Sequence, residues 1–218
     1  LFAGNIRMDP RIDEETTEQI TIETEKKIVN TIKEKIKDVD VVILSDYDKG
    51  MFKGTLGKKL IDEIKDNGRL VVAAPKPNSF DPETSKFTNA HVLILNNKEA
   101  STITNIPYTN KKSLETMSKK IVEQTQTEYL VITCGKDGMF CLDKERNAHF
   151  IPTKAKKVSD VTGAGDTSAA VLSLGIGAGL DIEDALRVAN YAAGIVVEKP
   201  GTATVSLEEL KERIEQDK

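Results

Sequence analysis

Four short apolar runs, rich in β-branched residues, constrain the fold of this chain more than any other feature. The runs are VDVVILS (39–45), RLVVAAP (69–75), AHVLILN (90–96) and EYLVITC (128–134). Unbroken apolar runs of this length are typical of strands that are covered on both faces. Segments 54–68 and 111–126 lie between runs and have the apolar spacing of helices. This alternation predicts an α/β fold with a mainly parallel sheet between helices.

The second half of the chain predicts further elements. Two short apolar stretches flank a polar centre in GMFCLDKERNAHFI (138–151), which indicates a β-hairpin at one edge of the sheet. Helices are expected at about 165–179 and 182–199. A last helix should follow Ser206, because Glu209 lies three residues later and the pair forms a capping box.

The first 38 residues are charged and give a weaker pattern. Thr and Ile alternate near their middle, and Ile28, Ile32 and Ile36 then recur at helical spacing. We expect an exposed strand or extension followed by a helix. The length of 218 residues predicts one main domain, taken as 26–218, after an extension at 1–25.

Composition and charge exclude several classes of function. The net charge is −4, with 31 Lys and Arg against 35 Asp and Glu, so a nucleic-acid partner is not expected. The longest apolar run, 169–180, is Gly-rich and too short to cross a bilayer, and no leader pattern opens the sequence, so we expect a cytoplasmic protein without a membrane partner. The spacing of Cys134 and Cys141 fits neither a zinc knuckle nor a redox pair and predicts two buried thiols.

The segment KKVSDVTGAGDTSAAVLSLGIGAGL (156–180) carries the chemistry that the sequence suggests. Gly163, Ala164 and Gly165 leave the start of a helix sterically open, and exposed N–H groups at a helix start bind anions such as phosphate. Asp166 beside that anion would be unfavourable unless it accepts a proton from an attacking hydroxyl. The pattern suggests phosphoryl transfer to an alcohol. The alternative is a tight turn with Asp166 as a helix cap.

Two other phosphate-binding motifs are excluded by the sequence. The sequence has no G-x-x-x-x-G-K-[ST] loop. GIGAG (175–179) lies within a helical run and does not follow a strand, so it is not a dinucleotide fingerprint.

DVTGAGDT (160–167) resembles the C-terminal signature of the ribokinase-like PfkB carbohydrate kinases. LSDYDKG (44–50) and ANYAAGIVVEKPGTATVS (189–206) are similar to strings in that family's heptose 7-phosphate kinases, and the likeness extends over about 39–210. The resemblance implies a ribokinase-like three-layer αβα fold with a mainly parallel central sheet.

The resemblance also implies roles for individual residues. Asp166 would be the general base, and the N–H groups of Gly163, Ala164 and Gly165 would form an anion hole. NNKE (96–99) matches the family's N-x-x-E pattern, so Asn96 and Glu99 would organise Mg²⁺ and its waters. Read without the family, Glu99 is an ordinary acid in the first turn of a helix.

Other roles concern the nucleotide and the substrate. The implied nucleotide-binding residues are Thr133, Gly135, Lys136, Gly138, Asn190, Lys199 and Gly201. Read without the family, the helix of Asn190 is a small-residue helix packed on its neighbour. The implied substrate-binding residues are Asp46, Lys49 and Lys76, close to the ends of strands where open α/β sheets bind ligands.

Departures from the family pattern are also present. Ala74 stands where the heptose kinases have Asp before Pro75 and Lys76. The family's N-terminal segment, with its Gly-Gly motif, its sugar-binding Asp and most of its lid, has no counterpart here. RIDEE (11–15) resembles the last lid strand, so the extension at 1–25 is read as a lid remnant.

The resemblance implies a kinase that uses ATP and Mg²⁺ to phosphorylate a small-molecule sugar or sugar phosphate. D-glycero-β-D-manno-heptose 7-phosphate is the first expectation, converted to the heptose 1-phosphate used in lipopolysaccharide precursor synthesis. The alternatives are another PfkB sugar kinase, similar to ribokinase or fructokinase, and a nucleotide-binding fragment without turnover. A homodimer is left open.

Overall fold

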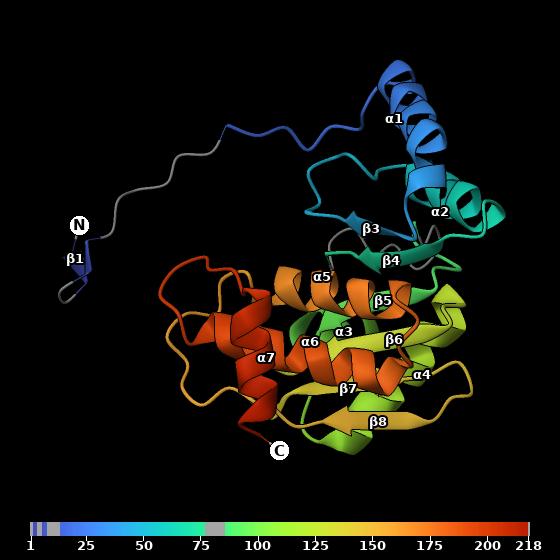
Figure 1. Cartoon of the computed structure of the whole chain (residues 1–218). Coiled ribbons are helices and arrows are strands. Elements are labelled where there is room, and N and C mark those ends of the chain that lie inside the picture. The colour runs from blue at the N-terminus through green and yellow to red at the C-terminus, as the bar shows by residue number, and fades with distance from the viewer. Residues whose placement is uncertain (1, 4–5, 8–13, 77–85, 218) are drawn as a thin grey trace.

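The computed structural model describes residues 2–3, 6–7, 14–76 and 86–217. A six-stranded sheet with the order β3-β4-β5-β6-β7-β8 organises the chain (Figure 1). Its strands are β3 (Val41–Ser45), β4 (Leu70–Ala74), β5 (Val92–Asn96), β6 (Tyr129–Thr133), β7 (Met139–Leu142) and β8 (Ala148–Ile151). Strands β3 to β6 are parallel, whereas β7 and β8 are antiparallel. The four predicted parallel strands and the edge hairpin are confirmed.

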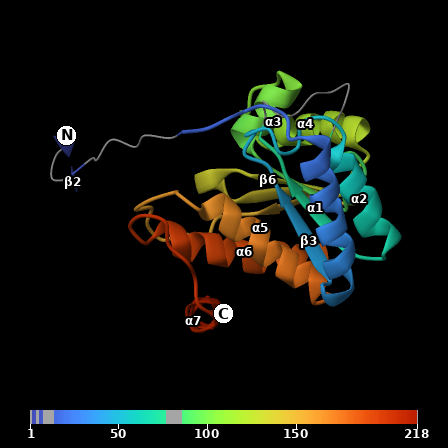
Figure 2. The same ribbon diagram turned by 90° about the horizontal axis from the view of Figure 1, so that it is seen from above.

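Helices cover both faces of the sheet (Figure 2). One side carries α1 (Ile22–Lys35), α2 (Leu56–Asp66), α3 (Asn97–Thr104) and α4 (Lys111–Thr125). The other side carries α5 (Ala164–Gly177) and α6 (Ile182–Val197), and α7 (Leu207–Glu215) packs on α6. The three-layer αβα arrangement predicted from the sequence is therefore confirmed.

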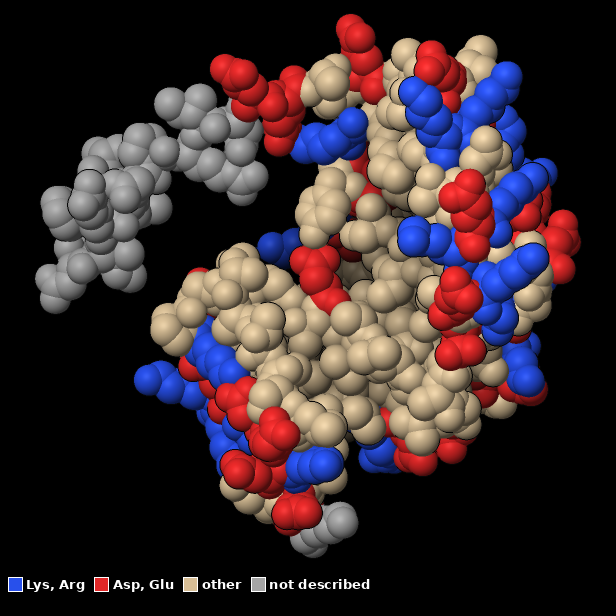
Figure 3. All heavy atoms as spheres, turned by 45° about the horizontal axis from the view of Figure 1, so that its top comes forward, with Lys and Arg blue, Asp and Glu red and all other residues tan. Residues whose placement is uncertain are grey.

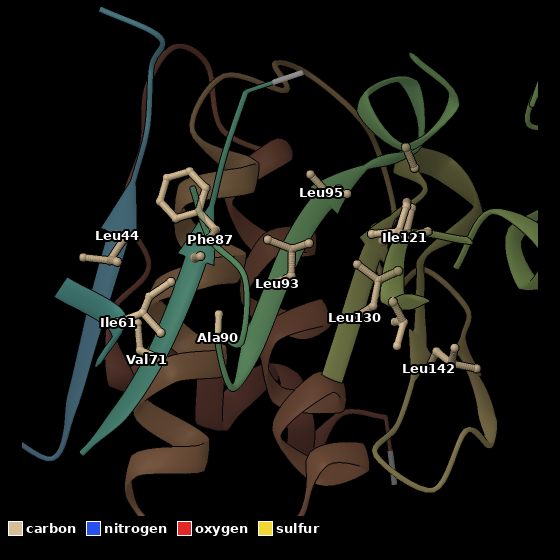
Figure 4. Close-up of a cluster of buried hydrophobic side chains, with 14 of the residues drawn as sticks. Leu44, Ile61, Val71, Phe87, Ala90, Leu93, Leu95, Ile121, Leu130 and Leu142 are labelled. Carbon is tan, nitrogen blue, oxygen red and sulfur yellow. The ribbon is translucent and has the colours of Figure 1, made fainter. Parts of the chain in front are cut away.

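The two faces of the sheet are packed with side chains of different size. Large residues from β3 to β7 meet α2 and α4 on one face, where Leu44, Ile61, Leu93 and Leu130 are buried (Figure 4). The other face is covered more closely, because α5 and α6 are rich in Ala and Gly. A Cβ added to Gly175 would lie 3.0 Å from the Cβ of Ala185, so a larger residue does not fit there.

The predicted extension and helix at the start of the chain are confirmed where the structure describes them. Residues 14–21 form neither helix nor strand, and α1 begins at Ile22 with the Thr21 side chain as its cap. The extension crosses the loop after β3, where a Cβ on Gly50 would lie 1.9 Å from the carbonyl oxygen of Glu18. Of the RIDEE segment, residues 11–13 lie outside the described residues. The division at residue 25 stays a prediction.

A short helix, α3, was expected only in the alternative reading of Glu99 as an acid in a first helical turn. It begins directly after β5 and has eight residues, too few for a clear apolar period. Two very short strands, β1 (Phe2–Ala3) and β2 (Ile6–Arg7), also pair near the N-terminus.

Two predictions from composition can be compared with the described residues. Cys134 and Cys141 are buried free thiols, and burial raises the pKa of Cys134 to about 12. Across residues 14–76 and 86–217, no helix combines the length and the apolar character that a membrane span requires.

Candidate active site

The carboxyl ends of β3, β4, β5 and β6 and the start of α5 surround a cavity of about 230 Å³. Figure 3 shows a hollow in the molecule with acidic and basic side chains around it. The polar side chains that line the cavity belong to Ser45, Asp46, Tyr47, Lys76, Asn96, Glu99, Thr133 and Asp166. Topology explains this gathering, because parallel strands bring their carboxyl ends to one edge of a sheet.

The start of α5 is open to a ligand. Gly163 is the N-cap, with a φ of +82° and no side chain to bond the first turn. The N–H of Ala164 donates to the Val161 carbonyl at 3.3 Å, so this group is already engaged. A Cβ added to Gly165 would have no described heavy atom within 4 Å. The N-terminal end of the α5 dipole therefore faces the cavity through Gly165, an arrangement that attracts anions.

Asp166 is the third residue of α5 and lines the cavity. The Tyr47 hydroxyl donates to both of its carboxylate oxygens, each at 3.0 Å. This hydrogen bond is the largest cause of the raised pKa of Tyr47. The cap position belongs to Gly163, so the alternative that Asp166 caps the helix does not describe this structure.

Asp46 presents a second carboxylate to the cavity. It is 2% exposed, and its Oδ1 accepts the N–H of Asp48 at 2.8 Å. Its Oδ2 is buried without a hydrogen-bond partner among the described residues. A buried carboxylate oxygen without a partner is unfavourable unless a ligand supplies a donor.

Asn96 and Glu99 hold each other at the start of α3. The Asn96 Oδ1 accepts the N–H of Glu99 at 2.8 Å, and Glu99 Oε2 accepts the N–H of Asn96 at 2.7 Å. The other Glu99 oxygen lies 3.7 Å from the Lys76 Nζ. In the described ranges, no three His, Cys, Asp or Glu side chains are grouped as a metal site. By itself the pair does not form a complete protein cage for a metal ion.

Three of the predicted site residues have partners of their own outside this cavity. Lys49 is paired with Glu15 of the N-terminal extension. Lys199 donates to the Thr204 carbonyl at 2.7 Å and pairs with a carboxylate of α7. Asn190 is 3% exposed and donates to the Pro152 carbonyl at 2.6 Å. Each of these contacts joins two segments of the fold, so each of the three residues has a structural role as well as its predicted one.

The predicted nucleotide-binding turn after β6 is only partly inside the cavity. Thr133 lines it, whereas Gly135, Lys136 and Gly138 lie beyond its lining. Gly138 has a structural reason to be Gly, because a Cβ would lie 2.0 Å from the Ile151 carbonyl oxygen. By contrast, Gly135 and Lys136 are exposed in a short turn.

Gly201 is similar to Gly135: its φ is +70°, and a Cβ would have no described atom within 4 Å. Both glycines leave backbone accessible to a ligand.

Sequence reasoning missed two polar residues of the cavity, Ser45 and Tyr47, and of the two Tyr47 contacts a predicted site residue, Asp166. Tyr47 lies inside LSDYDKG, directly after Asp46, yet only its neighbours were assigned roles. The available signal was an aromatic residue immediately after the carboxyl end of a buried strand. Its contact with Asp166 joins residues 119 positions apart and depends on the tertiary fold.

Curated relatives match almost the whole chain. Bifunctional protein HldE of Sulfurimonas denitrificans is 38% identical over 202 residues, which cover 93% of this chain and 41% of that protein. Bifunctional protein HldE of Desulfatibacillum aliphaticivorans is 37% identical over 205 residues, with 94% and 41% covered. The chain thus spans about 41% of the length of these relatives.

Solved structures show the same fold at low identity. Arabidopsis thaliana ribokinase, complexed with ribose and ATP, matches with a TM-score of 0.74 and 18% identity, over 90% of this chain and 60% of that one. Phosphofructokinase-2 from Escherichia coli, in complex with potassium, matches with a TM-score of 0.72 and 16% identity, over 88% and 63%. The fold is therefore ribokinase-like.

The sequence profile described as pfkB family carbohydrate kinase matches residues 12–210. This match covers far more than half of the 218 residues and includes every residue that lines the cavity. The chain belongs to the pfkB family of carbohydrate kinases.

Proposed function

We propose that this chain carries the catalytic and nucleotide-binding part of an ATP-dependent carbohydrate kinase. The observation that carries the proposal is the start of α5, where an uncapped helix end and the Asp166 carboxylate face one cavity. Phosphoryl transfer needs both, since one group must accept a proton and others must hold negative charge.

The proposed reaction follows from the positions of these groups. The acceptor hydroxyl of the sugar donates to Asp166, which takes the proton as the hydroxyl oxygen bonds to the γ-phosphorus of ATP. The bond from that phosphorus to the bridging oxygen breaks, and ADP leaves with the electron pair. Gly165 is the best-placed member of the proposed anion hole of Gly163, Ala164 and Gly165, because Ala164 already bonds Val161.

Magnesium would enter with the nucleotide and neutralise phosphate charge. Asn96 and Glu99 would orient its water ligands from the start of α3, while Lys76 lies beside Glu99. Thr133, Gly135, Lys136 and Gly138 would border the phosphates, and Asn190, Lys199 and Gly201 would border the adenine.

A nucleotide titration tests this half of the proposal. ATP or ADP with Mg²⁺ should raise the melting temperature, because a ligand at 100 times its Kd stabilises the folded state by about 2.7 kcal/mol. AMP without Mg²⁺ is the control and should shift it less. No shift at millimolar nucleotide would contradict the proposed nucleotide site.

We propose D-glycero-β-D-manno-heptose 7-phosphate as the substrate, phosphorylated at its anomeric hydroxyl. The support is the likeness of LSDYDKG and ANYAAGIVVEKPGTATVS to the heptose kinases and the 38% identity to an HldE protein. Asp46 would accept a sugar hydroxyl on its unpartnered oxygen, and Lys76 and Lys49 would attract the phosphate.

A substrate screen separates this sugar from other acceptors. ADP formation should be fastest with heptose 7-phosphate and slower with ribose or fructose. Turnover on ribose or fructose alone would keep the kinase and reject the heptose assignment, for which Ala74 is the main contrary sign.

A nucleotide-binding protein without turnover is the second candidate. The ion pair between Lys49 and Glu15 favours it, because it holds a predicted substrate cation outside the cavity. Nucleotide binding without ADP formation on any sugar would support this second reading.

A further inference from the structure

The Tyr47 side chain lies between a cation and the proposed base. Its hydroxyl donates to both Asp166 oxygens at 3.0 Å, and the Lys76 Nζ lies 5.2 Å from the centre of its ring. Lys76 in turn lies 3.7 Å from Glu99 Oε1. The contacts therefore run from the start of α3, through Lys76 and Tyr47, to the start of α5.

We propose that the Tyr47 hydroxyl is a displaceable plug on Asp166: it occupies the place of the acceptor hydroxyl until the sugar binds. This inference rests on the proposed function, because it assumes that Asp166 is the base. It assigns Tyr47 a positioning role that acts through Asp166.

The chemistry of the two donors supports a plug. A phenol and a sugar hydroxyl both offer one O–H to a carboxylate, so they compete for the same acceptor. Tyr47 spans both oxygens of Asp166, and an incoming hydroxyl must shift it. The contact raises the pKa of Tyr47, so the phenol stays a neutral donor in the physiological range.

The position of Tyr47 allows it to move. It is 54% exposed, and it follows the end of β3 directly. The next residue, Asp48, has a φ of +56°, and Gly50 has a φ of +88°, so the chain here has left regular strand geometry. Rotation of the Tyr47 ring toward solvent would leave the buried core unchanged, since Tyr47 is not part of it.

Lys76 provides a way for ligand binding to release the plug. Its contact with the Tyr47 ring is electrostatic and long, and a phosphate entering the cavity would attract the same ammonium group. As Lys76 turned to the phosphate, Tyr47 would lose one of its two contacts, and the sugar hydroxyl would then replace it on Asp166.

The contact itself can be measured without turnover by titrating the phenol. Subtracting the pH-dependent phenolate absorbance of Tyr47→Phe from that of the wild type gives the ionisation curve of Tyr47. Subtracting the absorbance of the double variant Tyr47→Phe/Asp166→Asn from that of Asp166→Asn gives the same curve in the absence of the carboxylate. We expect Tyr47 to ionise at lower pH in the Asp166→Asn background. The Tyr191 phenol, which bonds Asp217, is the control and should titrate unchanged. Identical Tyr47 curves in both backgrounds would overturn the proposal.

Kinetics test the plug. Tyr47→Phe should lower the KM for the sugar severalfold at a nearly unchanged kcat, because the sugar hydroxyl no longer has to displace the phenol from Asp166. Tyr191→Phe is the control for loss of a phenol elsewhere. A lower kcat with an unchanged KM for the sugar in Tyr47→Phe would show simple support of the base and would overturn the plug.

The failure of the two proposals can be distinguished. A wild-type protein that phosphorylates no sugar contradicts the proposed function, and the titration then still decides the Tyr47 contact. Normal sugar turnover with an unchanged KM for the sugar in Tyr47→Phe contradicts the plug alone.

Discussion

The starts of α3 and α5 face the same cavity and differ in how their first turns are capped. Each carries an acid at its third helical position, Glu99 in α3 and Asp166 in α5. Asn96 and Glu99 satisfy each other in a capping box, whereas Gly163 offers no cap and Asp166 bonds Tyr47 across the cavity. An acidic residue in the same helical position thus caps one helix and faces the cavity in the other.

Packing explains why α5 tolerates an open start. A missing cap costs a helix about 1 kcal/mol. Ala169 and Leu172 of α5 are buried against the sheet and α6, and burial of such residues offsets a cost of that size. The open end is therefore compatible with a stable helix.

The largest expected effect comes from Asp166→Asn. If Asp166 is the base, kcat should fall by roughly 10² to 10⁴ while nucleotide binding persists, because Asn cannot take the proton. The melting temperature should change little, since Asp166 caps nothing. Asp184, the third residue of α6, is a matched control away from the cavity, and Asp184→Asn should keep full activity. A near-normal kcat in Asp166→Asn would contradict the role of Asp166 as the base.

The next effect concerns Gly165. A Cβ there clashes with no described atom, so Gly165→Ala should leave the melting temperature nearly unchanged. It would crowd the proposed phosphate site, and we expect kcat/KM for ATP to fall by about tenfold, or about 1.4 kcal/mol.

Gly175→Ala near the other end of α5 supplies the contrasting variant. The new Cβ would lie 3.0 Å from the Ala185 Cβ, so overpacking should cost about 1–3 kcal/mol of stability. If Gly165→Ala lowers the melting temperature and leaves kcat/KM for ATP unchanged, the open start of α5 has a structural role only.

A smaller effect is expected at α3. Asn96→Ala removes the cap, which should cost about 1 kcal/mol and lower the melting temperature by about 2–4 °C. Ser206→Ala breaks the capping box of α7 and should show a similar loss without any change in nucleotide affinity. An unchanged melting temperature in Asn96→Ala would mean that the cap does not stabilise α3 and that the starts of α3 and α5 do not differ in capping.

The last effect depends on pH and concerns Tyr108, whose hydroxyl donates to Asp137. Burial and the hydrogen bond to Asp137 raise the pKa of Tyr108 to about 12, from the usual 10.0. The folded state therefore gains its full stability from this phenol below about pH 10 and loses it as the pH rises toward about 12. Denaturant unfolding should show a shallower alkaline decline in Tyr108→Phe. An unchanged decline would mean that groups other than Tyr108 cause the loss of stability at alkaline pH.

Much of the fold could be predicted from local patterns. The apolar runs that became β3 to β6 needed no tertiary information, because only a strand covered on both faces tolerates so many β-branched residues together. Ser206 and Glu209 gave α7 for the same reason, since a capping box is a local interaction. The eight residues of α3 give too short a period to predict a helix, and only the reading of Glu99 as a first-turn acid indicated one.

The sequence by itself determined most of the elements, their order along the chain and the open start of α5, because hydrophobic period and glycine conformation act within a few residues. Only the tertiary structure decided which side chains meet. It brought Tyr47 to Asp166, paired Lys49 with Glu15, and bonded Lys199 and Asn190 to nearby carbonyls. The physical reason is that such contacts join residues up to 119 positions apart, and their formation depends on strand order and helix packing, which no local pattern encodes.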